Sequence, residues 1–239
     1  MFNFTKKNII MIWIILIVFM IIGWAVGARL KSKFKEYSKI PTTSGLSGRE
    51  IAEKMLLDNN LIDVKVISVQ GRLTDHYNPL NKTVNLSPDV YNGRNVAAAA
   101  VAAHECGHAI QHANAYSWLE LRSTLVPIVS FSGKIINIDF LLGIFGAGLL
   151  QMFSFDTVLL IVIAAQTMIT AFTLITLPVE YDASERALIW LKSTGTTNIA
   201  ETDKAEDALT WAARTYLVAA LAAITQLAYY IMLFMGRRN

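Results

Sequence analysis

The sequence Ala103-His104-Glu105-Cys106-Gly107-His108 begins at the last residue of a segment, 96–103, that contains only alanine and valine. It contains the pattern HExxH. Residues four apart lie on the same face of an α-helix, so His104 and His108 can hold one metal ion. Glu105 then projects beside the metal, close enough to take a proton from a bound water molecule. HExxH also arises by chance, so the rest of the chain has to support this interpretation.

The composition indicates a membrane protein. Of the 239 residues, 54% are hydrophobic and only 16% are charged, and both values depart from those of soluble domains. The formal net charge of +3 is too small to favour nucleic acid as a partner. The single cysteine, Cys106, excludes an internal disulfide and is compatible with a reducing compartment. Its place in the helix points away from both histidines, so we interpret it as a packing residue.

Three segments are clear candidates for membrane crossings, each of which needs about 20 apolar residues. They are residues 9–28, 157–178 and 215–236, and none of them contains a charged residue. The first one resembles a secretory signal because Lys6 and Lys7 precede it and small residues end it. Its apolar part is too long for a signal peptide. We therefore expect an uncleaved anchor.

A fourth crossing is expected between the segments 9–28 and 157–178, although its limits are ambiguous. The apolar stretch 125–155 is interrupted by Lys134, Asn137 and Asp139. Either a helix crosses at about 119–138, or the crossing centres on 140–155 after an interfacial helix. We favour one broken or tilted crossing.

The topology follows from the distribution of basic residues. With four crossings, both termini lie on one side, and residues 31–118 and 179–210 share the other. Five basic residues follow the first crossing directly, whereas four flank the two termini, so the positive-inside rule predicts a cytoplasmic face for both shared segments. The expected divisions are an N-terminal anchor (1–30), an insert (31–118), two crossings (119–178), a glutamate-bearing helix (179–210) and a last membrane helix (211–239). Pro178 is expected to end the crossing 157–178, and Glu180 to open the helix that follows.

The insert has a readable order of helices and strands. Ser47-Gly48-Arg49-Glu50 is a capping-box pattern that opens a helix. Residues 64–69 alternate between apolar and polar and predict a strand, and two further strands are expected near 73–77 and 83–86, on either side of a turn. The HExxH helix should begin near Asn95. The fold class is therefore a mostly α membrane protein with about four transmembrane helices and a small zincin-like α+β insert.

On its motifs, the chain resembles the bacterial membrane-bound neutral zinc metallopeptidases of the YugP type. The motifs are LTDHYNP at 73–79, VNLS at 84–87, AAHECGHAIQHA at 102–113 and LPVEYDAS at 177–184. The chain is also distantly similar to the HtpX-type and CAAX-prenyl proteases, which have the pattern E-[FY]-x-A-D. Glu180, Tyr181 and Ala183 match that pattern, whereas Ser184 replaces its aspartate. The resemblance implies an integral protein of the bacterial cell membrane.

The resemblance also implies a function. His104, His108 and Glu180 would bind one Zn²⁺, and Glu105 would act as general base in the hydrolysis of a polypeptide substrate. The expected protein is an endopeptidase that acts on membrane or membrane-proximal proteins. A catalytically inactive zinc-binding membrane scaffold is the alternative. The presence of Glu105 favours the enzyme, because a structural zinc site has no use for a base and usually employs more cysteines. The sequence leaves the oligomeric state open.

Other polar residues are weaker candidates for a role in the site. His112 is rotated by about 80° from His104 on a helix, so we interpret it as a packing or substrate-side residue. His76 lies on an expected edge strand and could donate to the oxyanion of the substrate, although a structural role in the hairpin is the favoured alternative. Arg122 and Arg186 could bind a carboxylate, but contacts with solvent or lipid headgroups are favoured.

Overall fold

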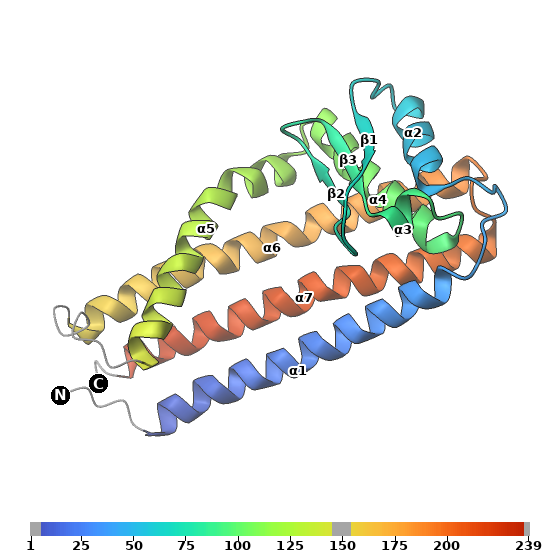
Figure 1. Cartoon of the computed structure of the whole chain (residues 1–239). Helices are drawn as coiled ribbons and strands as arrows, with labels where there is room; N and C mark the ends of the chain where they lie inside the picture. The colour runs from blue at the N-terminus through green and yellow to red at the C-terminus, as the bar shows by residue number, and fades with distance from the viewer. Residues whose placement is uncertain (1–5, 145–153, 237–239) are drawn as a thin grey trace. The chain divides into compact units, whose positions relative to one another are not determined.

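The computed structural model describes residues 6–144 and 154–236. In these residues, the chain forms seven helices and three strands (Figure 1). The elements are α1 (Lys6–Tyr37), α2 (Gly48–Asp58), β1 (Lys65–Ser68), β2 (His76–Asn78), β3 (Thr83–Leu86), α3 (Pro88–Tyr91), α4 (Val96–Ala113), α5 (Ser117–Ile144), α6 (Phe155–Ser193) and α7 (Ile199–Met235). They divide into two compact units. The helical unit comprises Met1–Ala25, Leu121–Thr176 and Tyr216–Asn239, and the mixed unit comprises Val26–Glu120 and Leu177–Thr215.

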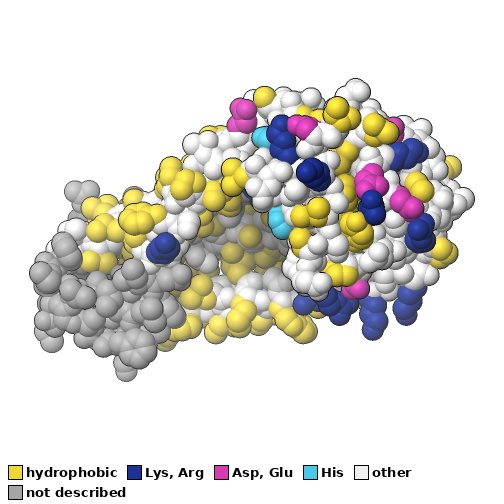
Figure 2. Space-filling view, turned by 45° about the horizontal axis from the view of Figure 1, so that its top comes forward, with side chains coloured by type: hydrophobic (Ala, Val, Ile, Leu, Met, Phe, Trp, Pro, Cys, Tyr) yellow, Lys and Arg dark blue, Asp and Glu magenta, His cyan; other side chains and the backbone are white. Residues whose placement is uncertain are grey.

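Three helices of the described residues are long and apolar enough to cross a membrane. They are Ile10–Tyr37, Asp156–Ser193 and Ile199–Met235, and each of them contains, to within one residue at one end, one of the three clear crossings that the sequence predicts. Many of their large apolar side chains are exposed, as the hydrophobic surface in Figure 2 illustrates. The predicted fourth crossing overlaps α5, which is not among these three helices, and its residues 145–153 lie outside the described part of the chain. The fourth crossing stays a prediction.

The candidate membrane helices continue well beyond the apolar segments. The helix α6 has 39 residues and is therefore about 58 Å long, against a hydrocarbon thickness of about 30 Å. The prediction that Pro178 ends one helix and that Glu180 opens another is wrong, because Pro178 lies inside α6. Proline removes one hydrogen-bond donor from a helix, but the residues after it are mostly good helix formers, so the helix continues.

The mixed unit contains a three-stranded sheet in the order β1-β3-β2. The central strand β3 pairs in parallel with β1 and antiparallel with β2, which leaves β2 at an edge. The strand β2 is shorter than predicted, since Leu73 has a positive φ of 58°, a conformation that interrupts a strand. The predicted positions of β1 and β3 are confirmed. So is the capping box at the start of α2, with both of its hydrogen bonds present.

The helix α4 is the centre of the mixed unit. Its N-cap is Asn95, whose side chain accepts a hydrogen bond from the backbone of Ala98, so the predicted start of this helix is confirmed. The alanines and valines that follow are buried on all sides of the helix. They form a hydrophobic core with α2 residues such as Ile51 and Met55, with the central strand β3, and with residues of α6 and α7. Small side chains let these elements approach α4 closely.

Candidate metal centre

Three side chains from two helices converge in the mixed unit. Nε2 of His104 and Nε2 of His108 lie 3.4 Å and 3.7 Å from Oε2 of Glu180. The two imidazole rings are nearly perpendicular, with centroids 4.7 Å apart. All three side chains place a ligand atom within 4.8 Å of the others, and the Glu180 side chain is almost fully buried. The two histidines and the glutamate that the sequence analysis selected are therefore close together.

The spacing of these donor atoms fits a zinc ion. Two ligand atoms at about 2.0–2.1 Å from a tetrahedral zinc ion are about 3.3 Å apart, and the two measured nitrogen–oxygen distances are near this value. Imidazole nitrogen and carboxylate oxygen are also common zinc ligands. Three protein ligands leave a fourth position open, which is the arrangement of catalytic zinc sites and not of structural ones.

A close contact between two backbones holds α6 against α4 at the site. A Cβ atom added to Gly107 would lie only 2.4 Å from the carbonyl oxygen of Ala183. Since Ala183 is one turn after Glu180, this contact brings the Glu180 carboxylate to the histidines that flank Gly107. Any side chain at position 107 would force α6 away from α4. The glycine of the sequence His104-Glu105-Cys106-Gly107-His108 is thus needed for the approach of Glu180 to the two histidines.

Comparison with known proteins agrees with this geometry. A family model described as "Putative neutral zinc metallopeptidase" matches residues 12–235. The chain belongs to this zinc metallopeptidase family. A curated relative from Bacillus subtilis (strain 168), "Putative membrane protease YugP", is 39% identical over 211 residues, which are 88% of this chain and 91% of that protein. No solved structure matches the chain. The resemblance stated from the motifs is confirmed, and the described residues of this zinc metallopeptidase include three candidate membrane helices.

In the metallopeptidase, a glutamine determines which nitrogen of His108 is free. Nδ1 of His108 donates to the amide oxygen of Gln111 at 3.0 Å. The amide nitrogen of Gln111 donates to the carbonyl of Val179 and to the carboxylate of Asp182. Because both of those partners only accept hydrogen bonds, the orientation of the amide is fixed. In the neutral ring the proton of His108 is therefore on Nδ1, so Nε2 faces Glu180 with a free lone pair and donates to it only when the ring carries a second proton.

The hydrogen bonds continue to Arg186, which sequence analysis favoured as a solvent or lipid contact. Arg186 donates to both oxygens of Asp182, at 2.6 Å and 3.1 Å, and Asp182 accepts from Gln111. The resulting chain, Arg186–Asp182–Gln111–His108, orients one of the two histidines. Sequence analysis missed Gln111 and Asp182. The available signal was the spacing of Asp182 and Arg186 by four residues, which predicts an ion pair on one helix face.

Ser184 takes the place of the aspartate found in the distantly similar proteases. Nδ1 of His104 lies 3.1 Å from Oγ of Ser184. A hydroxyl can accept a hydrogen bond from Nδ1–H, as a carboxylate would. A hydrogen bond at Nδ1 therefore holds each ring, and both rings present Nε2 toward Glu180. Such outer partners orient the ligands of a metal and fix their tautomers.

Charge interactions shift two pKa values at the site. Burial alone would lower the pKa of His108, but the hydrogen bond with Glu180 and the negative charges of Glu180 and Glu105 outweigh burial and raise it. Burial would raise the pKa of Glu180, but hydrogen bonds from His104 and His108 outweigh burial and lower it. A metal ion has to displace the proton that His108 gains. We therefore expect the affinity for metal to fall as the pH is lowered through the pKa of His108.

Glu105 is buried, with 8% of its surface exposed. It follows His104 directly in α4, and its charge contributes to the raised pKa of His108. Cys106 lies on the side of α4 that faces away from the two histidines, where Sγ lies 3.6 Å from the carbonyl oxygen of Ala52 in α2. Burial raises the pKa of the Cys106 thiol. The burial of Cys106 agrees with its interpretation as a packing residue.

The other two histidines lie on or beside the edge strand β2. His112 is exposed, and its Nδ1 lies 2.9 Å from the hydroxyl of Tyr77. It does not belong to the group of potential ligands. His76 is exposed, and its Nδ1 donates to the carbonyl of Thr74 at 2.8 Å. A neutral His76 then has no proton on Nε2. It would have to be protonated to donate to an oxyanion, so the structure favours the hairpin role.

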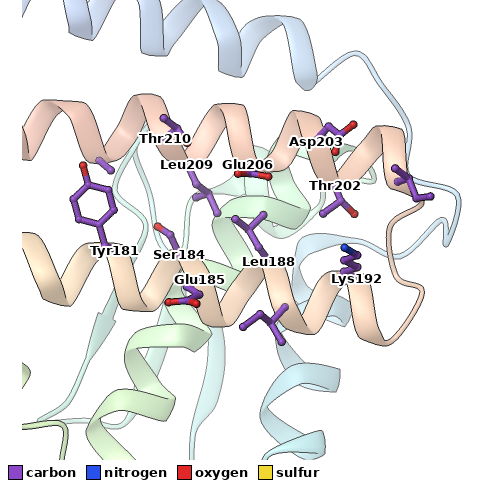
Figure 3. Close-up of a pocket in the computed structure, with 13 residues that line it drawn as sticks. Tyr181, Ser184, Glu185, Leu188, Lys192, Thr202, Asp203, Glu206, Leu209 and Thr210 are labelled. Atoms are coloured by element: carbon purple, nitrogen blue, oxygen red, sulfur yellow. The ribbon is translucent and has the colours of Figure 1, made fainter.

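A groove of about 460 Å³ lies between α6 and α7 beside the metal centre. Figure 3 shows the residues that line it from both helices. Ser184 is among them, so the hydroxyl that lies against His104 also borders the groove. Acidic side chains are more numerous than basic ones in the lining. These charged residues are Glu185, Lys192, Asp203 and Glu206.

Replacing Gln111 by leucine is expected to weaken zinc binding by about 10- to 100-fold. Leucine has a similar size but cannot accept a hydrogen bond from Nδ1–H of His108, so the ring loses its orientation. The measurement is a zinc titration of the purified protein against a competing chelator. Glu185→Gln is the control, because Glu185 is exposed on α6 and is not part of the hydrogen-bond chain. An unchanged zinc affinity in Gln111→Leu would show that the chain does not support the site.

Proposed function

We propose that this protein is an integral-membrane zinc endopeptidase of the gluzincin type. The observation that carries the proposal is the convergence of His104, His108 and Glu180 directly beside the glutamate of an HExxH helix. A single zinc ion fits these three donors. When bound, zinc would polarise the scissile carbonyl and make a coordinated water molecule more acidic.

The residues of the chain have separate roles in this proposal. Glu105 takes a proton from the water and passes it to the leaving amine. The edge strand β2 offers its free backbone groups to an extended polypeptide, which can add to the sheet as a further strand. Ser184 and Gln111 keep the two imidazole rings in place. Substrates would be membrane proteins or polypeptides close to the membrane, because Glu180 follows the proposed crossing 157–178 by two residues.

The alternative is a membrane scaffold that binds zinc and has no activity. A scaffold would need the three ligands and the hydrogen bonds behind them, but it would not need Glu105. Glu105 is a nearly buried carboxylate, burying a carboxylate costs free energy, and a scaffold has no use for it. This favours the enzyme.

A test of the site uses Glu180, because it joins α6 to the HExxH helix. Glu180→Ala is expected to lower the zinc affinity by at least about tenfold and to remove nearly all hydrolysis of casein. Glu180→His should restore part of the zinc binding, since imidazole is a good zinc donor. Glu185→Ala serves as the control and should keep the metal. Full zinc occupancy in Glu180→Ala would mean that the third ligand is a different residue.

We also propose that the mixed unit faces the cytoplasm and that the chain crosses the membrane four times, with the domain limits given above. The basic residues after the first apolar segment support this topology. A reporter fused after Asn239 should be external, whereas reporters inserted near Ser44 or Asn198 should be cytoplasmic. If the reporters after Asn239 and near Asn198 are both cytoplasmic, the number of crossings is not four.

A further inference from the structure

The mixed unit has a second and larger cavity, of about 800 Å³, next to the N-terminal half of α4. It is formed by the end of α1, by the segment that leads into β2, and by α3 and α4. Its lining has an apolar part and a charged part, and none of its residues belongs to the candidate metal centre. The residues are Lys31, Phe34, Lys35, Ser38, Arg72, Leu73, Asp75, Ser87, Asp89, Val90, Asn95, Ala97, Ala98 and Val101.

The cavity lies on the same face of α4 as the metal centre. Ala97 and Val101 line the cavity, and they precede His104 and His108 by seven residues each. Residues separated by three, four or seven positions share one face of a helix. Val101 is less than one turn before His104, so the cavity begins about 5 Å along the helix from the first histidine.

The strand β2 connects the cavity with the metal centre. Leu73 and Asp75, just before β2, line the cavity, whereas Tyr77 inside β2 contacts His112, one turn beyond His108. The segment 73–77 therefore runs along α4 from the cavity past both histidines. Because β2 is an edge strand, an extended peptide can pair with its free side. A peptide held there at the metal centre would extend into the cavity.

The free charges around the cavity are positive. Lys31 and Lys35 are one turn apart on α1, both are exposed, and neither has an ion-pair partner in the part of the chain that the structure describes. Figure 2 shows Lys and Arg side chains gathered along an edge of the mixed unit.

The acidic groups of the cavity, in contrast, already have partners. Both carboxylate oxygens of Asp75 accept hydrogen bonds from Ser87. Asp89 is paired with Arg72 at 3.5 Å. A ligand in the cavity therefore meets two unpaired ammonium groups and no unpaired carboxylate.

We propose that this cavity is a substrate subsite that takes an aspartate or glutamate side chain near the scissile bond. The proposal rests on the proposed endopeptidase function. Lys31 and Lys35 would bind the carboxylate, and Phe34 and Val101 would pack against the aliphatic part of the side chain. The end of the first membrane helix would thus determine cleavage specificity, although it contributes no metal ligand.

The test compares the parent protein with the double variant Lys31→Glu/Lys35→Glu, each full-length in phosphatidylcholine nanodiscs. The probes are quenched octapeptides of alanine and leucine in which glutamate, alanine or lysine is placed at each position in turn. In the parent, one position within three residues of the scissile bond should favour glutamate over lysine by about tenfold in kcat/KM. The double variant should lose or reverse this preference at unchanged zinc content. Lys39→Glu is the control, because Lys39 is exposed and does not line the cavity.

A parent protein without charge preference, or a double variant that keeps it, would overturn the subsite. A second arm measures equilibrium binding of the same peptides, made with a fluorophore, to Glu105→Gln protein. If no peptide is hydrolysed, the proposed function fails. The binding arm still decides the subsite, because glutamate peptides should bind more tightly than lysine peptides only when Lys31 and Lys35 are present. Nanodiscs with phosphatidylglycerol form a third arm. If the lysine variants alter only the response to this anionic lipid, the lysines contact headgroups and the subsite is wrong.

Discussion

Replacing Glu105 by glutamine is expected to reduce hydrolysis by about 10²- to 10⁴-fold while the protein keeps about one equivalent of zinc. Glutamine has nearly the same shape, but its amide cannot take up the proton of the water molecule. The measurement combines casein hydrolysis with metal analysis of the same purified sample. This result would distinguish the enzyme from the inactive scaffold, in which the change should leave casein hydrolysis unaffected.

The control for this experiment is Glu185→Gln, which removes the same charge from an exposed position on α6. It should retain activity near that of the parent. Turnover of Glu105→Gln close to the parent rate would assign the general base to another group. Loss of zinc together with activity would instead assign Glu105 a role in holding the metal.

Replacing His104 or His108 by alanine is expected to reduce the zinc content from about one equivalent to almost none after dialysis. Each change removes one of three protein ligands, and two ligands do not hold zinc well. It also leaves Glu180 without one of the two imidazoles that surround it. Metal analysis before and after dialysis gives the result directly.

His112→Ala is the matched control, since His112 lies on the same helix one turn after His108 and contacts Tyr77 instead of the site. It should keep its zinc. Full occupancy in both ligand variants would contradict the assignment of the site. Loss of zinc in His112→Ala alone would indicate that the HExxH helix is aligned differently with the metal.

Local patterns were sufficient for the elements whose formation depends on near neighbours. The capping box at Ser47 and Glu50 was readable because both partners lie within one turn. The start of α4 at Asn95 was readable for a similar reason, as its side chain satisfies the first free backbone donors. Alternation of polar and apolar residues predicted β1 and β3.

Helix ends within long helices were harder to predict. Pro178 was expected to stop a helix on local grounds, yet α6 continues to Ser193. After Pro178, α6 packs Ala183 against Gly107 and buries Leu191 in the core of the mixed unit. These contacts favour a continuous helix, and their partners, such as Gly107 in α4, are far from Pro178 in the sequence.

For the site, the sequence alone determined the pair His104 and His108 together with Glu105, because a single helix sets their spacing. It pointed to Glu180 through family resemblance and not through geometry. Only the tertiary structure brings Glu180 to the histidines, since this depends on the approach of two helices at Gly107. The partners behind the rings, Gln111, Asp182 and Ser184, were likewise decided by that approach. Helical periodicity relates residues within one helix, whereas the hydrogen bonds across two helices depend on how closely their backbones pack.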